Sequence, residues 1–402
     1  MVRRRLRILF TSSGYSIGGA TMAMMHLAIG LASLGHEPIV LTSRPASRYS
    51  HLFERLRRNG VRVLSFGGDY RSILYWVWLF FRTLRTIRAM AVDIVHCHGT
   101  KEAVVVGVAA KLGRKTVVYT LEGDPLIELQ LAGAGPLSRL LMLLLLHVGL
   151  RLADRVAACS SWLAEHVRAR YGVEAIGIWN PIDYERFSEV RKAESAVPII
   201  TFVGRLERVK GVETLLMALS ELRKSGRSDV TLRLIGEGPL RRRLERLCKD
   251  LGIDGGVIFV GHVGDVERHL ADSWAFVLPS LYEPFGMAAA EASVAGLPVI
   301  ASNVGGLREI VVEGETGFLF RPGDYRELSK LLATVLDNEN LRRRLGEKGR
   351  ERAKEFAAAK IAEKYVELYL SVLARKEGPN RCNKTVNIHG YTPDYLKRYT
   401  MR

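Results

Sequence analysis

Two glutamates with seven residues between them, Glu283 and Glu291, follow an apolar run that ends at Pro279. The residue before a proline avoids the helical conformation, so Glu283 is predicted on a loop and Pro284 in the first turn of a helix. Glu291 lies six residues past Phe285, which is about 9 Å along the helix axis at roughly 1.5 Å per residue. This separation excludes one acid–base pair but suits the two ends of a long ligand whose anionic middle contacts the free amides of the helix start. A sugar joined to a ribose by a diphosphate has this shape, and two exposed glutamates without a ligand are the alternative.

Two cations occupy a comparable position in an earlier strand–turn–helix unit. A strand-like run over 198–204 ends at Arg205, and a turn through Lys210 leads into a helical pattern. Open α/β sheets bind ligands at the carboxyl ends of their strands. Arginine offers a fork and lysine a point charge for phosphate oxygens. Ordinary surface cations are the alternative in a chain with 59 Lys and Arg residues. The combination of this turn with the two glutamates favours a phosphate-binding role.

The elements that position these residues alternate along the whole chain. Strand-like runs alternate with helical patterns, which is typical of α/β proteins with a parallel, doubly wound sheet. The second half repeats the pattern of the first, so the 402 residues are predicted to form two domains. Predicted strands cover 6–11, 38–42, 61–66, 93–97, 116–120 and 155–159, then 199–203, 231–235, 257–260, 275–278 and 298–301.

The domain boundaries follow from this alternation. We predict a first domain over residues 1–180, a charged linker over 181–197 and a second domain over 198–375. The cleft between two such domains is the default ligand site. The second domain ends in a pattern of two or three helices, and the polar tail over 376–402 stays unassigned.

Short motifs occur in a fixed order along most of the chain, from about residue 5 to 375. They lie at 18–20, 93–98, 180–183, 203–206 with 210–211, 236–239, 261–263, 283–291, 296–301, 305–306 with Glu309, and 314–319. In this order they resemble the motifs of retaining glycosyltransferases of family 4, the glycosyl transferases group 1. The resemblance implies the GT-B fold, in which two Rossmann-like domains with parallel, doubly wound sheets face each other across a cleft. It also implies that the last helix crosses back onto the first domain.

The resemblance implies transfer of a sugar from a nucleotide-diphosphate sugar to an acceptor hydroxyl, with retention at the anomeric carbon. Front-face attack assisted by the leaving phosphate needs no protein nucleophile. No cofactor and no metal are expected, because cations neutralise the diphosphate. The implied catalytic residues are Arg205, Lys210, Glu283 and Glu122. The implied donor-binding residues are Gly18, Gly19, Arg205, Lys210, Val263, Glu283, Phe285, Gly286, Met287 and Glu291.

One position departs from the family pattern. Many relatives carry a histidine after the strand that here ends near Leu121, and this chain has Glu122. A carboxylate changes the charge and the hydrogen-bonding role, so Glu122 is predicted on the acceptor or sugar side of the cleft. His98 ends another strand and is predicted to face the same cleft. His96 shares the side of His98 while Cys97 faces away, which argues against a metal site in this triplet.

The charge and the cysteine content limit which classes of partner and which cellular compartment are expected. The formal net charge is +17, and the first 190 residues are the more densely basic part. Such a field favours anionic partners, and no nucleic-acid-binding motif is present. Four cysteines without paired spacing favour a reducing compartment, so a cytoplasmic location is predicted.

Two apolar segments bear on membrane contact, although neither reaches the roughly 18–20 residues that span a bilayer. The leucine-rich segment 137–150 is predicted as a buried helix, with a membrane-surface helix as the alternative. The aromatic run 73–81 precedes Arg82, Arg85 and Arg88, and this fits an interfacial helix or a core helix with one solvated face. The basic charge and this stretch predict peripheral attachment to the anionic inner face of a membrane.

Two other functions stay open. A non-catalytic basic protein that binds membranes or polyanions could keep the fold without the activity, and a nucleotide-sugar epimerase shares the architecture. Arg205, Lys210, Glu283 and Glu291 favour the transferase, whereas Glu122 favours the non-catalytic protein. The sequence identifies neither the donor base and sugar nor the oligomeric state. It also does not show whether the acceptor is a glycan, a lipid or a small molecule.

Overall fold

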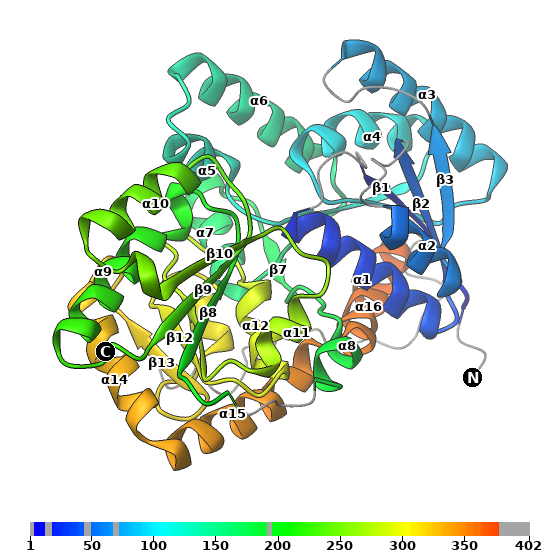
Figure 1. The fold of residues 1–402 in the computed structure, drawn as a ribbon. Helices are drawn as coiled ribbons and strands as arrows, with labels where there is room; N and C mark the ends of the chain where they lie inside the picture. The colour runs from blue at the N-terminus through cyan, green and yellow to red at the C-terminus, as the bar shows by residue number, and fades with distance from the viewer. Residues whose placement is uncertain (1–3, 13–17, 44–49, 67–71, 191–194, 378–402) are drawn as a thin grey trace.

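The computed structural model describes residues 4–12, 18–43, 50–66, 72–190 and 195–377. The chain forms two parallel sheets that lie beside each other, each with its own helices (Figure 1). This arrangement confirms the predicted fold class of two doubly wound α/β units. The unassigned tail lies, from residue 378 on, outside the described residues.

The first sheet has the strand order β3-β2-β1-β4-β5-β6-β7, with parallel neighbours throughout. Every residue of β4 and β5 is buried, as expected for a parallel sheet covered on both faces. The order reverses between β1 and β4, where the following loops diverge and leave room for a ligand. The strands are β1 (Arg7–Ser12), β2 (Glu37–Ser43), β3 (Arg62–Phe66), β4 (Ile94–Cys97), β5 (Thr116–Leu121), β6 (Arg155–Ala158) and β7 (Ala175–Gly177).

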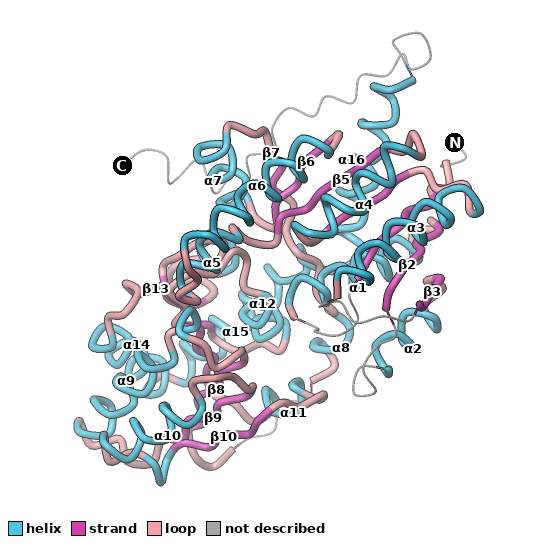
Figure 2. The backbone as a smooth tube through the Cα atoms, turned by 90° about the horizontal axis from the view of Figure 1, so that it is seen from above, coloured by secondary structure: helices cyan, strands magenta, loops and turns pink. Residues whose placement is uncertain are grey.

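Right-handed crossovers divide the helices of this unit between the two faces of the sheet. The helices are α1 (Gly19–Ser33), α2 (Ser50–Arg58), α3 (Ile73–Ala89), α4 (Thr100–Leu112), α5 (Pro125–Leu131), α6 (Pro136–Leu152) and α7 (Ser161–Tyr171). Helices α3, α4 and α6 lie side by side on one face, and α4 packs against both of its neighbours (Figure 2).

The second sheet has the order β10-β9-β8-β11-β12-β13, and its switch point lies between β8 and β11. Its strands are β8 (Ile199–Val203), β9 (Thr231–Ile235), β10 (Val257–Gly261), β11 (Ala275–Leu278), β12 (Val299–Ser302) and β13 (Gly317–Phe320). Helix α8 (Tyr184–Ser188) precedes this sheet. The helices that follow are α9 (Val212–Lys224), α10 (Arg241–Asp250), α11 (Val266–Ala271), α12 (Met287–Val294), α13 (Leu307–Ile310), α14 (Tyr325–Asp337), α15 (Glu339–Ala353) and α16 (Ala358–Glu377).

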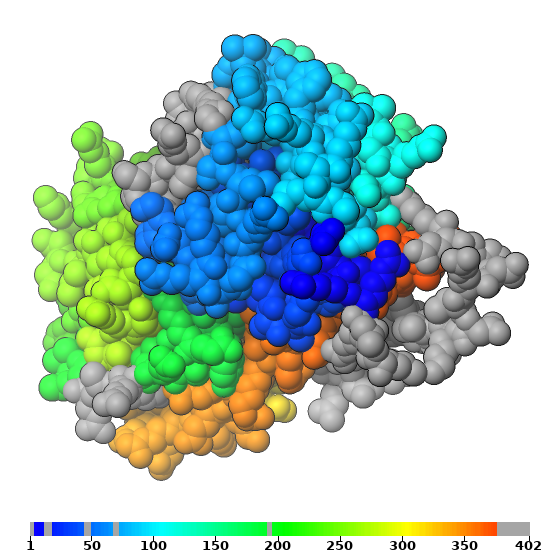
Figure 3. Space-filling view, turned by 90° about the vertical axis from the view of Figure 1, so that its right-hand side faces the viewer, coloured from blue at the N-terminus to red at the C-terminus, as the bar shows by residue number. Residues whose placement is uncertain are grey.

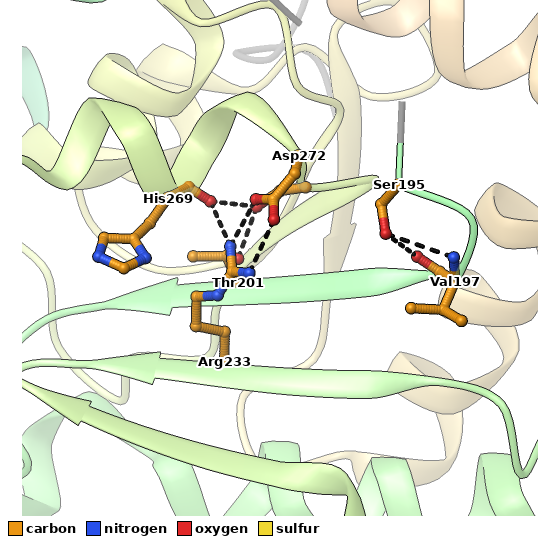
Figure 4. Close-up of polar contacts among 7 residues, drawn as sticks. Ser195, Val197, Thr201, Arg233, His269 and Asp272 are labelled. Carbon is orange, nitrogen blue, oxygen red and sulfur yellow. Dashed lines mark hydrogen bonds and ion pairs between the residues drawn. The ribbon is translucent and has the colours of Figure 1, made fainter. Parts of the chain in front are cut away.

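Arg233 on β9 fixes the segment after α11 against the second sheet. Its guanidinium donates to both carboxylate oxygens of Asp272, at 2.6 and 2.9 Å (Figure 4). This bidentate bond holds the pKa of Asp272 below its ordinary value. Next to it, the hydroxyls of Thr201 and Ser273 are 2.7 Å apart. The short helix α11 is therefore held in place by polar contacts with two neighbouring strands.

The last described helix, α16, packs against α1 of the first sheet (Figure 1). A Cβ at Gly30 of α1 would collide with the carbonyl group of Ala358, so glycine allows this close approach. Two buried tyrosines of α16 bond to polar side chains of the first sheet. The hydroxyl of Tyr369 lies 2.7 Å from His96 Nδ1, and that of Tyr365 lies 3.0 Å from the hydroxyl of Thr120. The C-terminal helix thus completes the polar part of the first core.

All predicted strands form, and each boundary agrees to within one residue. The sequence analysis missed the short strands β7 and β13 and the short helices α5 and α8. These elements have three to seven residues, too few for a clear hydrophobic period.

The predicted start of the helix after Glu283 is wrong. Helix α12 begins at Met287, three residues after Pro284. Gly286 has a φ of 108°, a left-handed conformation that a helix cannot contain. The loop before it is held instead by the amide of Gly306, which donates to the carbonyl of Glu283 at 3.0 Å.

The prediction that the leucine-rich segment is a buried helix is also wrong. The segment forms α6, but only Leu146, Gly149 and Leu150 of this helix are buried. Leu137 at its start is 79% exposed, and further leucines along the helix are more than half exposed. None of the helices within the described residues is both long enough and apolar enough to cross a membrane.

Candidate functional site

The turn after β8 places Lys210 beside the loop after β11. Lys210 Nζ lies 2.6 Å from a carboxylate oxygen of Glu283, and Ser280 donates to the same oxygen at 2.9 Å. A Cβ at Gly211 would collide with the carbonyl oxygen of Pro279, so glycine lets the two loops touch. Glu283 lies on a loop, as predicted, and is almost fully buried. The ammonium group has three donors, and those not used by Glu283 can meet an anionic ligand.

Arg205 stands at the start of the same turn and has a different environment. Its side chain is 71% exposed, and its guanidinium pairs with Glu207 at 3.0 Å. The backbone around it is held firmly, because Leu206 exchanges hydrogen bonds with Glu237 and Leu240 at 3.0 Å. Arg205 therefore combines a backbone held by hydrogen bonds with an exposed guanidinium, which suits recognition of a phosphate group.

The start of α12 presents backbone donors next to these cations. Within the described part of the chain, the amides of Phe285, Gly286 and Met287 donate to no acceptor. Gly305 and Gly306 support this loop, since a Cβ on either would collide with the backbone of Glu283, Pro284 or Phe285. Free amides at a helix start attract anionic groups.

Gly18 and Gly19 bring the first unit to the same place. Gly18 caps the start of α1, and a Cβ at Gly19 would lie 3.7 Å from the sulfur of Met287. The preceding residues 13–17 lie outside the described residues. The two predicted glycines are therefore brought opposite the start of α12, as the family resemblance implies.

Glu291 lies near the middle of α12, about one turn past Met287. Burial raises its pKa to about 8, against the opposing charge of Arg186 and with a further rise from Asp183 and Glu267. Arg186 on α8 also donates to the carbonyl of Gly264, beside the predicted Val263, at 2.5 Å. A carboxyl that is protonated at neutral pH can both donate to and accept from the hydroxyls of a ligand.

Glu122 and His98 meet at the carboxyl ends of β5 and β4. His98 Nδ1 lies 2.8 Å from one carboxylate oxygen of Glu122, and Asn180 donates to the other at 2.7 Å. Glu122 thus has two polar partners, neither of which the sequence alone identifies. His98 Nε2 is buried, with no partner among the described residues.

His96 shares one side of β4 with His98, as predicted, and the two rings are 4.3 Å apart. Both nitrogens of His96 bond to hydroxyls, at 2.7 Å each, and burial together with His98 lowers its pKa well below the ordinary value. His96 is thus a neutral core residue. Within the described ranges, no group of three histidine, cysteine or acidic residues is arranged to hold a metal ion.

Sequence analysis missed a second carboxyl next to the cations. Glu128 on α5 faces the charges of Arg205 and Lys210, while burial raises its pKa. A Cβ at Gly123 would collide with the carboxylate of Glu128 and lie 3.2 Å from Pro284, so glycine keeps this junction open. The sequence does contain a signal for helix α5, because Asp124 followed by Pro125 is a typical helix cap and first residue.

Sequence analysis also gave no role to the residues that join the two units near the site. Glu309 accepts hydrogen bonds from the amides of Ser161 and Trp162, at 3.1 and 2.8 Å, and from the indole of Trp179 at 2.6 Å. It thereby caps the start of α7 across the junction. Nearby, the hydroxyl of Tyr282 accepts from the amide of Asp124 at 2.6 Å.

Solved structures share this fold. Sucrose-phosphate synthase from Thermosynechococcus elongatus superposes with a TM-score of 0.75 at 24% identity, over 92% of this chain and all of that one. Anabaena HepE, solved in complex with UDP and glucose, superposes with a TM-score of 0.75 at 22% identity, over 91% of this chain and all of that one. The architecture is therefore that of GT-B glycosyltransferases.

Sequence comparison identifies the family. The model for Glycosyltransferase Family 4 matches residues 17–186, and the model for Glycosyl transferases group 1 matches residues 183–352. A glycogen synthase of Mycobacterium tuberculosis is 30% identical, over 93% of this chain and 97% of that protein. The N-acetyl-alpha-D-glucosaminyl L-malate synthase of Bacillus anthracis is 27% identical, over 89% and 95%. The chain belongs to the glycosyl transferases group 1, glycosyltransferase family 4, as predicted.

Proposed function

We propose that the protein is a retaining glycosyltransferase that moves a sugar from a nucleotide-diphosphate sugar to an acceptor hydroxyl. The carrying observation is that the Lys210 turn, the Glu283 loop and the start of α12 converge beside the switch point of the second sheet. Ligands of open α/β sheets bind at such a point. Family membership supports a transferase over an epimerase or a non-catalytic protein.

The donor runs along α12 in this proposal. Arg205 and Lys210 neutralise the diphosphate and the charge that grows on the leaving nucleotide. The amides of Phe285, Gly286 and Met287 contact phosphate and sugar oxygens, with Gly18 and Gly19 opposite. Glu283 accepts from the sugar hydroxyls, and Glu291 binds the ribose, next to Val263. The HepE structures with UDP and with UDP-glucose support a nucleotide-sugar of this kind.

The acceptor lies on the side of the first sheet. Glu122 and His98 are the proposed contacts for its hydroxyl, because they stand where β4 and β5 end, next to the junction. The hydroxyl attacks the front face of the anomeric carbon, and the leaving phosphate takes its proton. This reaction retains the anomeric configuration without a protein nucleophile, a cofactor or a metal. The predicted cytoplasmic location stays a prediction.

Binding of one class of nucleotide-sugar tests the donor site. Among UDP-, GDP- and ADP-sugars, at least one is expected to raise the melting temperature, because a ligand of the folded state stabilises it by about 2.7 kcal/mol at 100 times its Kd. The rise is expected to persist in EDTA, since Arg205 and Lys210 handle the diphosphate. Differential scanning fluorimetry measures both.

Two results would contradict this proposal. If none of these nucleotide-sugars raises the melting temperature at any concentration, the donor site is wrongly assigned. If the stabilisation disappears in EDTA and returns with Mg²⁺ or Mn²⁺, a metal rather than the two cations neutralises the diphosphate.

Replacing Glu122 with glutamine separates its role in function from its role in stability. Glutamine keeps the size of the side chain, but one carboxylate oxygen becomes an amide donor that faces His98 or Asn180. We expect the free energy of unfolding to fall by about 1 kcal/mol and turnover to fall more than tenfold. Turnover is measured as release of nucleoside diphosphate from the donor found by the binding screen.

Glu174→Gln is the matched control, because this glutamate is exposed on the same unit. It is expected to change neither stability nor turnover. If Glu122→Gln melts several degrees earlier with unchanged kinetics, Glu122 is a structural carboxylate of the first core. Residues other than Glu122 would then bind the acceptor.

A further inference from the structure

Exposed apolar side chains are concentrated on one face of the first sheet. Of the 16 large hydrophobic side chains that are exposed among the described residues, 12 belong to α3, α4 and α6. They are Ile73, Leu74, Val77, Trp78 and Phe81 on α3, Val108 and Leu112 on α4, and Leu137, Leu140, Leu141, Leu144 and Val148 on α6. We name these twelve residues the α3–α4–α6 surface. Patches of this kind mark interaction sites in proteins that otherwise bury their apolar groups.

The three helices form one layer rather than three separate patches. Helix α4 lies between α3 and α6 and packs against both (Figure 2). A Cβ at Gly149 of α6 would lie 3.1 Å from Ala103 of α4, which shows how closely these two helices approach. The space-filling view shows α3 and α4 forming the upper edge of the molecule, in light blue and cyan (Figure 3). The exposed residues therefore belong to one continuous helical layer.

The leucines of α6 are unusual because most of them are exposed to solvent although leucine favours burial. The C-terminal half of α6 packs on α4 through Leu146, Gly149 and Leu150, whereas its first two turns expose Leu137, Leu140 and Leu141. Exposing leucine to water costs about 1.5–3 kcal/mol per side chain relative to full burial. A chain that keeps several of them at one protruding end gains from burying them elsewhere.

The charge around this surface identifies the partner. Neither α3 nor α6 contains an acidic residue, while α3 ends with Arg82, Arg85 and Arg88. All three arginines are exposed, and Arg82 lies over the ring of Trp78 at 5.4 Å. Phe81, Arg85 and Arg88 also line a shallow groove of about 450 Å³. Aromatic rings beside arginines, on and next to two apolar helices without acidic residues, match the interface of an anionic bilayer.

We propose that the α3–α4–α6 surface docks on an anionic lipid bilayer. The leucines of α6 and the aromatic residues of α3 enter the acyl boundary, and the arginines contact lipid phosphates. A second copy of the chain is a poorer partner, because it would bring another basic rim against the first. This inference extends the stretch that sequence analysis predicted for membrane contact and adds α6, which that analysis placed in the core. It does not depend on the donor chemistry proposed above.

Vesicle binding tests the proposal on the full-length protein. The wild type is expected to co-sediment with phosphatidylcholine vesicles that contain phosphatidylglycerol, and to bind less at high salt, since the Debye length shortens to about 3 Å at 1 M. Leu137→Ser/Leu141→Ser removes apolar contacts, and Arg85→Ser/Arg88→Ser removes charge. Each double variant is expected to lower the partition coefficient at least about tenfold. Ile258→Ser is the matched control, because Ile258 is 50% exposed on β10, far from this surface in the chain.

Three results overturn the proposal. The first is no binding of the wild type to anionic vesicles at low salt, and the second is unchanged binding of both double variants. The third is that light scattering shows a wild-type dimer and a monomeric Leu137→Ser/Leu141→Ser variant, which would show that a second copy covers the surface. The shift in melting temperature with a nucleotide-sugar is measured on every variant. If the nucleotide-sugar still raises the melting temperature of the variants as it does for the wild type, a negative vesicle result concerns only the membrane surface. If it does not raise the melting temperature of the wild type, the result contradicts the proposed donor site instead.

Discussion

Replacing Arg205 with alanine is expected to lower turnover about 100-fold, on the order of 3 kcal/mol of transition-state stabilisation. In the proposed reaction the guanidinium meets charge that grows as the leaving nucleotide departs, so its loss affects the transition state more than the bound substrate. The melting temperature is expected to stay the same. Arg205 is 71% exposed and, among the described residues, forms an ion pair only with the partly exposed Glu207; pairs with an exposed partner contribute little to stability.

Arg208 provides the control for this prediction, because it is an exposed arginine in the same turn. Arg208→Ala is expected to retain turnover. Lys210 is a less direct test, since removing its ammonium group leaves the buried carboxylate of Glu283 without its ion-pair partner. Near-normal turnover in Arg205→Ala/Lys210→Met would show that the donor diphosphate binds elsewhere.

Replacing Glu309 with alanine is expected to destabilise the protein by about 3 kcal/mol. The carboxylate is buried and accepts three hydrogen bonds, two of them from the start of α7. Its removal leaves the amides of Ser161 and Trp162 and the indole of Trp179 without this acceptor, and each buried orphan costs about 1–3 kcal/mol unless water reaches it. Unfolding in urea, followed by circular dichroism, measures the free energy.

Glu309→Gln should lie between alanine and the wild type, because its one oxygen can serve only part of the three donors. Glu315→Ala, at an exposed position shortly after α13, is the control and should leave stability unchanged. If Glu309→Ala unfolds at the same urea concentration as the wild type, the contacts across the junction contribute nothing measurable. Other contacts between the units, such as the bond from the amide of Asp124 to Tyr282, would then hold the junction together.

The sheets could be predicted because their signals are local. Each central strand is a continuous apolar run such as Val117-Val118-Tyr119, bounded by polar or glycine residues, and a buried parallel strand needs nothing further. The start of α12 could not be predicted in the same way. Pro284 is a good first residue for a helix, but Gly286 is left-handed, and the loop packs against Gly306 and Leu307, about 20 residues further along the chain.

The residues of the proposed donor side could be selected from the sequence because they lie within short motifs. Arg205 and Lys210 share one turn, and Glu283 and Glu291 share one loop and helix. The partners of Glu122 were not accessible, because His98 and Asn180 come from other loops, 24 and 58 positions away. Pairing over such separations is set by the order of strands in the sheet, which a single sequence does not contain.

Helix α6 shows a limit of a different kind. A helix that is apolar on all sides is usually buried in its own protein, and the run from Leu140 to Leu146 fits that rule. The same run also suits a helix that is half covered by its own domain and half by something outside it. The apolar sequence of α6 predicts that the helix is covered, but it does not show by what. The structure shows that the rest of the protein buries only Leu146, Gly149 and Leu150, in the half of α6 that packs near α4.

The attachment of α16 to the first unit has a consequence for the order of events during synthesis. His96 Nδ1 bonds to the hydroxyl of Tyr369, and the hydroxyl of Thr120 bonds to that of Tyr365; both tyrosines are synthesised after the whole first sheet. Until those tyrosines leave the ribosome, the first unit is a nascent domain with an uncovered α1 and an incomplete polar cluster in its core. A chain cut before Ala358 therefore lacks part of its N-terminal domain, although every residue of that domain's sheet is present.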